Sequence, residues 1–329
     1  MNFRTEINIP PSLQKITHRS KSLFIGSCFT ENIGNQMQKL KFTSMVNPFG
    51  ILYNPLSINT CLQRLLTKKP FTTKELHHFN EQWHSWEHHG RFSDSDPNQC
   101  LKDIHQEQNS ASDFLKQADY LLLTLGTAFV YQWKESGQIV ANCHKIPQKQ
   151  FEHYRVSTSE IVNTLLPTLQ QIQEINPQLQ IIFTLSPIRH WKNGAIDNQI
   201  SKASLLVAIH ELKAKLKNAH YFPAYEIMMD DLRDYRFYES DMLHPTSMAI
   251  DYIWEKFQGV YLGEKTKQLM LQVKKILNAK NHRPRNPKSE AHQKFLQKQL
   301  RQIEALEKRH SFLNFEVEKR YFREAMILN

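Results

Sequence analysis

The sequence predicts an α/β fold with a five-stranded parallel sheet between two layers of helices, followed by a helical C-terminal extension. Three observations support this. Short apolar runs alternate with segments of helical spacing, polar and reactive residues follow the ends of those runs, and the net charge lies entirely near the C-terminus. Strands that alternate with helices indicate βαβ crossovers, and such crossovers build parallel sheets that are covered on both faces.

The predicted strands are five apolar runs: Ser22–Ile25, Phe42–Val46, Tyr120–Leu125, Gln180–Leu185 and His220–Tyr225. The predicted helices lie between them, at about 31–41, 55–67, 110–118, 158–175 and 198–217. Thr158-Ser159-Glu160 offers capping chemistry to one of these helices, and Asn176-Pro177 ends it. Residues 68–118 are less regular, and we expect an insertion there between the second and third strands.

Charge divides the chain into a neutral body, residues 1–264, and a basic tail, residues 265–329. The tail holds 16 Lys and Arg against 6 Asp and Glu, which accounts for the whole net charge of +10. Beyond a basic, Pro-containing linker, apolar residues from Phe295 to Leu306 recur near helical spacing. We expect one amphipathic helix there that packs on the body or on a second subunit of a homo-oligomer. Nucleic acid or an anionic surface is the alternative partner, but no aromatic-and-basic recognition motif accompanies the charge.

Several classes of protein are excluded by what the sequence lacks. It has no apolar run of about 18 residues, so we expect no membrane span. Its first residues lack the apolar segment of a secretory signal, and its four cysteines do not make a disulfide framework. Reduced thiols in the cytoplasm are therefore expected. Without a phosphate-cradling Gly-rich loop or a dinucleotide fingerprint, we expect no cofactor.

Reactive residues follow the predicted strands at one edge of the sheet. Ser27 and Cys28 stand where the first strand gives way to a helix, and a helix N-terminus favours negative charge on a thiol. The other strands are followed by Asn47–Gly50, Gly126-Thr127 and Ser186–His190, and a longer loop carries Asp241 and His244. Because ligands bind outside the carboxyl ends of parallel strands, this convergence predicts an active site.

The string Gly26-Ser27-Cys28-Phe29-Thr30 resembles the motif after which the GSCFA-domain family is named, although Thr30 departs from its last letter. Further stretches resemble the family's pattern over roughly residues 1–260: NPFGILYNP at 47–55, NCHKIP at 142–147, SPIRH at 186–190 and DDLRDYRFYESDMLHP at 230–245. The family is placed among the SGNH (GDSL-like) hydrolases. The resemblance therefore implies a three-layer α/β/α fold with a flavodoxin-like sheet.

The resemblance also implies a nucleophile and its partners. In the SGNH register Cys28 falls on the catalytic Ser, and Ser27 becomes an orienting neighbour. The competing assignment makes Ser27 the nucleophile, with Cys28 packed beneath it. Asp241 and His244 match the family's Asp-x-x-His block, in which His acts as general base and acid and Asp holds its tautomer.

The oxyanion hole matches the family less well. Gly50 corresponds to one backbone donor, but Ala128 stands where the family has an Asn amide. Either Thr127 or Asn47 substitutes, or this donor is missing, and one such donor is typically worth about 10²–10³ in rate.

Other residues have weaker functional signals. The insertion holds five His between His77 and His89, in no zinc-binding spacing, so we expect no metal and interpret it as aromatic packing or as a lid in which His88 or His89 contacts substrate. Cys143 and His144 are adjacent, which favours a structural or pocket-wall role over a dyad. Arg189 and His190 either bind a substrate carboxylate or phosphate or form a salt-bridged scaffold.

These observations favour a hydrolase or acyltransferase that acts on a small-molecule or carbohydrate acyl ester through a covalent acyl-enzyme. The alternative is a non-catalytic binding protein that keeps the fold. The substituted Asn position favours that alternative, whereas Cys28, Asp241 and His244 oppose it.

Overall fold

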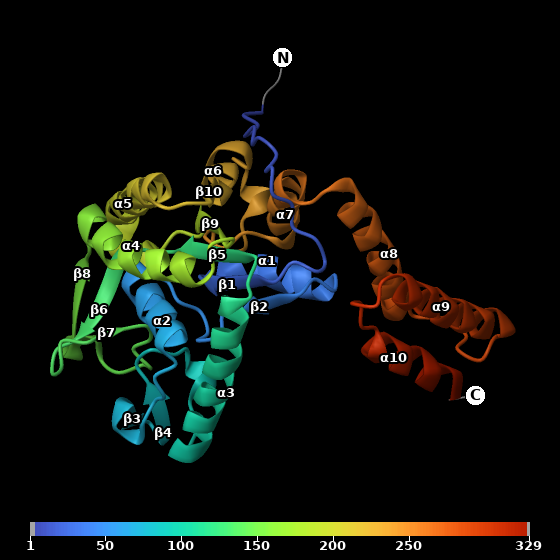
Figure 1. Ribbon diagram of the computed structural model, residues 1–329, viewed down its shortest axis with the longest axis horizontal. Coiled ribbons are helices and arrows are strands. Elements are labelled where there is room, and N and C mark those ends of the chain that lie inside the picture. The colour runs from blue at the N-terminus through green and yellow to red at the C-terminus, as the bar shows by residue number, and fades with distance from the viewer. Residues whose placement is uncertain (1–3, 328–329) are drawn as a thin grey trace. The chain divides into compact units, whose positions relative to one another are not determined.

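The computed structural model describes residues 4–327, which fold as two units. The first unit comprises residues 4–10, 21–35 and 44–257, and the second comprises residues 11–20, 36–43 and 258–327. Figure 1 shows the sheet and the elements of the first unit in blue to yellow and the C-terminal helices in orange and red.

A five-stranded parallel sheet forms the centre of the first unit. Its strands are β1 (Ser22–Gly26), β2 (Ser44–Val46), β5 (Tyr120–Leu125), β9 (Gln180–Leu185) and β10 (Ala219–Phe222). Their order across the sheet is β10-β9-β5-β1-β2, which is the flavodoxin-like order. Every neighbouring pair is parallel, with Ser22 opposite both Ser44 and Tyr120. The predicted fold class is confirmed.

Helices cover both faces of this sheet because alternate residues of each strand point to opposite sides. In sequence order, the helices are α1 (Cys28–Lys39), α2 (Pro55–Thr67), α3 (Pro97–Lys116), α4 (Thr158–Ile175), α5 (Gly194–Lys215), α6 (Ala224–Glu226) and α7 (Ser247–Tyr261). On one face Leu23, Leu121 and Ile181 share a core with α2, α4 and α5. On the other face Phe24 lies against α1, and Phe222 meets Phe257 of α7 edge-on.

Several predicted boundaries are wrong, for identifiable local reasons. The third helix begins at Pro97 rather than near 110, because Asp96 accepts a hydrogen bond from the Asn98 N–H and Pro occupies the first helical position. The irregular insertion also contains a hairpin of β3 (Leu76–Phe79) and β4 (Gln82–Ser85). Its two turn residues, Asn80 and Glu81, both have positive φ, as a type I′ turn requires.

A second small sheet lies between β5 and α4 in the sequence. It is formed by β6 (Phe129–Trp133), β7 (Ile139–Val140) and β8 (Phe151–Arg155), in the order β7-β6-β8. Both pairings are antiparallel. The sequence pattern did not predict these strands.

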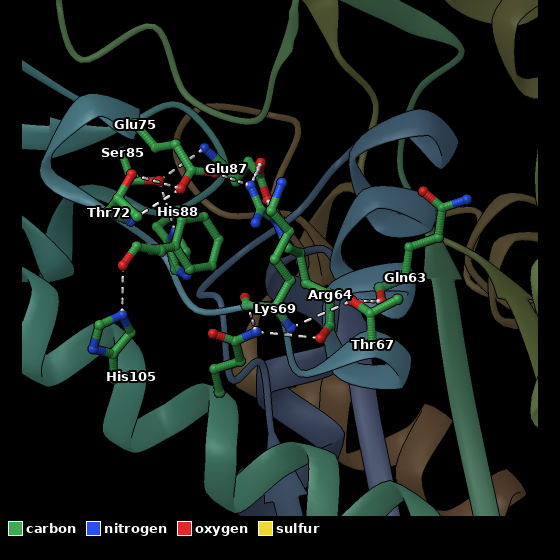
Figure 2. A network of polar contacts seen from close by, with 12 residues as sticks. Gln63, Arg64, Thr67, Lys69, Thr72, Glu75, Ser85, Glu87, His88 and His105 are labelled. Carbon is green, nitrogen blue, oxygen red and sulfur yellow. Dashed lines mark hydrogen bonds and ion pairs between the residues drawn. The ribbon is translucent and has the colours of Figure 1, made fainter.

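An ion-pair network centred on Arg64 ties α2 to the insertion (Figure 2). Arg64 donates two hydrogen bonds to the Glu87 carboxylate, at 2.7 and 3.0 Å, and a third to Glu75 at 2.5 Å. Its guanidinium also lies 4.0 Å from the centre of the Phe71 ring. The Glu87 side chain is only 9% exposed, and burial raises the pKa of its carboxyl. Arg64 therefore compensates a buried negative charge.

We expect Arg64→Met to lower the free energy of unfolding by about 3–5 kcal/mol, because it leaves the Glu87 carboxylate buried without its partner. Denaturant unfolding at neutral pH measures this loss. Glu75→Gln is the matched control, since Glu75 is more exposed, and it should cost about 1 kcal/mol or less. The double variant Arg64→Met/Glu87→Leu should recover most of the loss. A loss below about 1 kcal/mol for Arg64→Met alone would contradict this account.

The second unit contains α8 (Glu264–Asn281), α9 (Glu290–Arg309) and α10 (Glu316–Ile327). The predicted single helix beyond the linker is therefore two helices, α9 and α10. Leu296, Ile303 and Leu306 of α9 are buried in one core with residues of α8 and α10. The apolar face on which the homo-oligomer prediction rested is thus covered within one chain. Within the described residues, no helix is long and apolar enough to span a membrane.

Candidate functional site

The junction between β1 and α1 is shaped by Gly26. Its φ is +146°, and an added Cβ would lie 2.3 Å from the Thr124 carbonyl oxygen of the neighbouring strand, so no other residue fits there. The Gly26 N–H donates to Asn47 Oδ1 at 2.9 Å, and its carbonyl accepts from the Leu52 N–H at 3.0 Å. These contacts hold the turn that presents Ser27 and then begins α1 at Cys28.

Ser27 and Cys28 differ in accessibility. Ser27 is 1% exposed, and its Oγ is buried without a hydrogen-bond partner among the described residues. Cys28 is partly exposed, and all four cysteines of the chain are free thiols. Both residues line a cavity of about 500 Å³ at the carboxyl edge of the sheet. An attacking group has to reach its substrate, so this difference favours Cys28.

His244 enters the same cavity from a tight loop before α7. His244 Nδ1 lies 2.5 Å from Asp241 Oδ2, while Asp241 Oδ1 accepts the N–H groups of Leu243 and His244 at 2.9 Å. These backbone bonds, then the His244 side chain, lower the pKa of Asp241 to about 2. With Nδ1 held by a carboxylate, Nε2 of His244 is the nitrogen left to exchange a proton. Among the described residues no hydrogen bond joins His244 to Cys28.

Lys202 of α5 is a buried cation beside the cavity, and the sequence analysis missed it. It is 1% exposed, and its Nζ donates to the carbonyls of Gly126 at 2.8 Å and Ser186 at 2.7 Å. These two carbonyls follow the ends of β5 and β9. Burial lowers the pKa of Lys202 to about 7, with a further lowering from the charge of Arg189 and an opposing effect of Cys28.

The thiol of Cys28 is subject to opposing influences. Burial raises its pKa, whereas the backbone N–H groups of Cys28 and Phe29 and the charge of Lys202 lower it. Burial is the largest of these influences, so the net direction is upward and differs from the lowering that a helix N-terminus alone produces. A base is therefore needed to generate the thiolate near neutral pH.

The candidate oxyanion donors are mostly engaged in structural bonds. The Gly50 N–H donates to the Asn47 carbonyl at 2.7 Å, and the Thr127 N–H donates to the Tyr53 carbonyl at 3.0 Å. Asn47 is fully buried and is not part of the cavity lining. Ala128 is also fully buried, and its N–H donates to Ser201 Oγ. Only Thr127 of this group reaches the cavity, where its hydroxyl already accepts from the Phe129 N–H at 3.1 Å.

Position 50 requires a glycine for a structural reason. Its φ is +79°, and an added Cβ would lie 2.1 Å from Cβ of His89. The glycine therefore lets the loop after β2 pass directly beneath His89, which lines the cavity.

A side-chain amide that the sequence analysis did not single out lies in the cavity wall. Asn142 follows β7, and its Oδ1 accepts the His144 N–H at 2.9 Å. This bond fixes the amide, and within residues 4–327 its Nδ2 has no hydrogen-bond partner. The signal was the NCHKIP string, which resembles the family pattern and begins with this residue.

The remaining candidates divide into cavity residues and packing residues. His89, Arg189 and His190 line the cavity, as does Cys143. Burial, together with the charges of Lys202 and His244, lowers the pKa of His190 to about 4. His144 does not line the cavity, and its Nε2 is bonded to the Ser85 carbonyl at 2.9 Å.

The His-rich insertion is held by ring packing. His77 stacks on Trp86 at 3.6 Å, and His84 stacks on His144 at 4.4 Å. His88 stacks on Phe49 and bonds to Ser85 Oγ, so it is a core residue rather than a substrate contact. Within the described residues, no group of three or more His, Cys, Asp or Glu is placed to hold a metal ion.

Comparison with protein-family models matches residues 21–257 to the GSCFA family and residues 273–327 to the C-terminal domain of GSCFA domain proteins. Comparison with curated proteins gives no match.

Two solved structures are similar to this chain. One is described as that of a "putative platelet activating factor" from Streptococcus pneumonia, at 13% identity and a TM-score of 0.36, over 73% of this chain and 84% of that one. The other is an acetyl xylan esterase from the rumen bacterium Butyrivibrio proteoclasticus, also at 13% and 0.36, over 83% of this chain and 66% of that one.

Proposed function

This chain belongs to the GSCFA family, and we propose that it transfers the acyl group of an ester or thioester through a covalent intermediate on Cys28. One observation carries the proposal. Cys28 and His244 lie 216 positions apart in the sequence and line one cavity, and Asp241 fixes Nδ1 of His244. A thiol, an imidazole and a carboxylate in that order are the parts of a nucleophile, a base and its orienting group.

The reaction begins with transfer of the Cys28 thiol proton to Nε2 of His244. The sulfur then attacks the carbonyl carbon, which forms the C–S bond and places negative charge on the carbonyl oxygen. When the intermediate collapses, the bond to the leaving group breaks and the leaving oxygen or sulfur takes the proton from His244. Water, or the hydroxyl of an acceptor, next gives its proton to His244 as its oxygen attacks the acyl carbon. The C–S bond then breaks, and His244 returns the proton to the sulfur of Cys28.

The charge on the carbonyl oxygen needs N–H donors that are held in place and are not already hydrogen-bonded to another group. We assign this role to the backbone N–H of Cys28 and the Asn142 amide, because Gly50, Thr127 and Asn47 are engaged or buried. Lys202 contributes as a positioning residue, since it ties the ends of β5 and β9 together and places a cation near the thiolate. All of these residues lie in the predicted catalytic body, residues 1–264, and we assign no chemistry to the tail.

Trapping of the intermediate tests this function. The protein is mixed with an acetyl thioester such as S-acetyl thiophenol, quenched in acid within seconds, and mapped by peptide mass spectrometry. We expect an acetyl group on Cys28 in the wild type and in Ser27→Ala, and none in Cys28→Ala. Acetylation of Ser27 would reassign the nucleophile. A protein that binds the thioester without any acetylation would be the non-catalytic alternative, which the engaged oxyanion donors favour.

A further inference from the structure

The cavity that holds Cys28 and His244 is electropositive. Among the described residues that line it, none is Asp or Glu, whereas Arg189 and Lys192 bring two cations to the same stretch of its wall. Lys202 lies behind that wall, bonded to the Ser186 carbonyl. The predicted body as a whole, residues 1–264, carries balanced charge, so the positive cavity is a local feature. A cleft lined by charges of one sign concentrates ligands of the opposite sign.

Arg189 has an incomplete set of hydrogen bonds. Its one bond is to Gln199 Oε1, at 3.5 Å, and its Nε is buried without a partner among residues 4–327. Arg4, Arg64 and Arg236, by contrast, each pair with a carboxylate. A guanidinium carries five N–H donors in a fixed plane, and leaving a buried one unfilled costs free energy. Carboxylate and phosphate oxygens match that geometry.

The sequence left open a salt-bridged scaffold as the alternative role of Arg189, but no carboxylate of the described residues forms an ion pair with it. Arg189 also lines a neighbouring cavity of about 690 Å³, together with Asp234 and Asp241. Asp241 is held by His244 and two backbone N–H groups, and Asp234 is paired with Arg236 at 2.8 Å. Both carboxylates of this neighbouring cavity are therefore already engaged.

Another part of the wall of the Cys28 cavity is aromatic, and it contacts the second cation. Tyr131 and His153 of the β6–β8 pair stack at 4.2 Å, and Phe129 lies beside His153. Lys192 donates to the Tyr131 hydroxyl at 2.7 Å, which leaves its ammonium two further N–H groups. The cavity thus offers an apolar surface beside two cationic donors.

We infer that the acyl compound accepted by this site carries an anionic oxygen group, a carboxylate or a phosphate, which Arg189 and Lys192 bind. This inference rests on the proposed function, because it names the substrate class of the same site. The acyl carbonyl lies at Cys28 and the anionic group at the Arg189–Lys192 end, while the apolar part of the compound packs on Tyr131 and Phe129.

A pair of thioesters that differ by one carboxylate provides the kinetic test. S-acetyl thiophenol is neutral, and S-acetyl 4-mercaptobenzoate carries the anion. We expect the wild type to prefer the carboxylated thioester by about tenfold in kcat/KM, mostly through KM, as one charged hydrogen-bonded contact allows. Arg189→Met should bring the ratio close to one, and Arg189→Lys should keep part of it. An unchanged ratio in Arg189→Met, or no preference in the wild type, overturns the inference.

A binding test separates this inference from the proposed function. Benzoate, phenyl phosphate and benzyl alcohol are compared as protectants of Cys28 against alkylation by iodoacetamide, which is uncharged. We expect both anions to protect, less so at high salt, and the alcohol to protect poorly; the better anion distinguishes carboxylate from phosphate. Protection by the anions without thioester turnover would keep the anion site and overturn the proposed function. Equal protection by the alcohol would overturn the anion site even if turnover occurs.

A folding control accompanies both tests, since Arg189 is partly buried. Thermal unfolding compares Arg189→Met with wild type, and Lys192→Met provides a second variant on the more accessible cation. If Arg189→Met does not fold, loss of anion protection in Lys192→Met supports the inference, and unchanged protection with no salt dependence overturns it.

Discussion

Replacing Cys28 by Ala is expected to lower kcat/KM for acetyl thioester hydrolysis by on the order of 10⁴-fold or more, while Ser27→Ala stays within about tenfold of wild type. The nucleophile of a covalent mechanism cannot be replaced by water without losing the acyl-enzyme route. Ser27, by contrast, is 1% exposed and its Oγ has no partner among the described residues, so removal of that oxygen leaves the cavity wall intact. Steady-state release of thiophenol measures both effects.

The same assay tests the proposed base, His244, and its orienting partner, Asp241. His244→Ala should lower kcat/KM about as much as Cys28→Ala. The two residues act as one unit, so the effects of their removal are not additive, and the double variant should be no less active than either single variant. Asp241→Asn keeps the size of the side chain but changes the tautomer that it holds, so it should lose up to about 10⁴-fold. Activity that survives in Cys28→Ala and disappears in Ser27→Ala would show that the assignment of the nucleophile is wrong.

The parallel sheet was predictable because its three central strands, β1, β5 and β9, are buried on both faces and are therefore continuous apolar runs. Tyr120–Leu125 and Gln180–Leu185 were predicted with the bounds that the structure has. The small antiparallel sheets were not predictable in the same way. Their strands are short and half exposed, and the β3–β4 turn uses Asn80 and Glu81 rather than an Asn-Gly pair, so no strong hairpin signal is present.

The convergence of Cys28, Arg189 and His190 on one cavity follows from topology, since the carboxyl ends of parallel strands share an edge. Asn142 was harder to place because it comes from the loop between β7 and β8, outside that sheet. The order of strands in the parallel sheet does not predict that such a loop reaches the carboxyl edge of that sheet.

Lys202 had a signal that the sequence analysis did not use. Asn198, Ser201, Lys202 and Leu205 recur at helical spacing and are all buried, in line with Ala208, Ile209 and Leu212. A Lys in the apolar stripe of a helix is rarely buried without a function. Helical periodicity therefore placed a cation on the inner face of α5, where its Nζ meets Gly126 and Ser186.

Replacing Lys202 by Met is expected to change how stability depends on pH. The folded protein holds the pKa of Lys202 at about 7, below its ordinary value of 10.5, because the ammonium is buried. Between these two values the unfolded chain binds the proton and the folded chain does not, so raising the pH favours folding. The penalty for the buried charge is fully present below pH 7 and is gone above about pH 10.5. A shift of this size corresponds to on the order of 5 kcal/mol.

Denaturant unfolding of wild type and Lys202→Met at pH 6 and pH 10 isolates this effect. The Met variant leaves the Gly126 and Ser186 carbonyls without their donor at every pH, at a cost of about 1–3 kcal/mol each, and that cost cancels in the comparison between the two pH values. Wild type should therefore gain several kcal/mol relative to Lys202→Met between pH 6 and pH 10. Lys213→Met, an exposed change on the same helix, is the control and should show no such gain.

The reactivity of Cys28 should move with the same substitution. In the wild type the charge of Lys202 lowers the pKa of the Cys28 thiol, whereas burial raises it. Removing the cation therefore leaves the effect of burial less opposed, and the thiolate forms less readily. Alkylation by iodoacetamide near pH 7, where Lys202 is still partly charged, should therefore be several-fold slower in Lys202→Met, and the difference should shrink as the pH rises well above the pKa of Lys202. A merely structural lysine would alter the stability curve and leave the alkylation rate near pH 7 unchanged. Parallel stability curves would show that the pKa of Lys202 is not lowered in the folded protein, and an unchanged alkylation rate would show that its charge does not act on the Cys28 thiol.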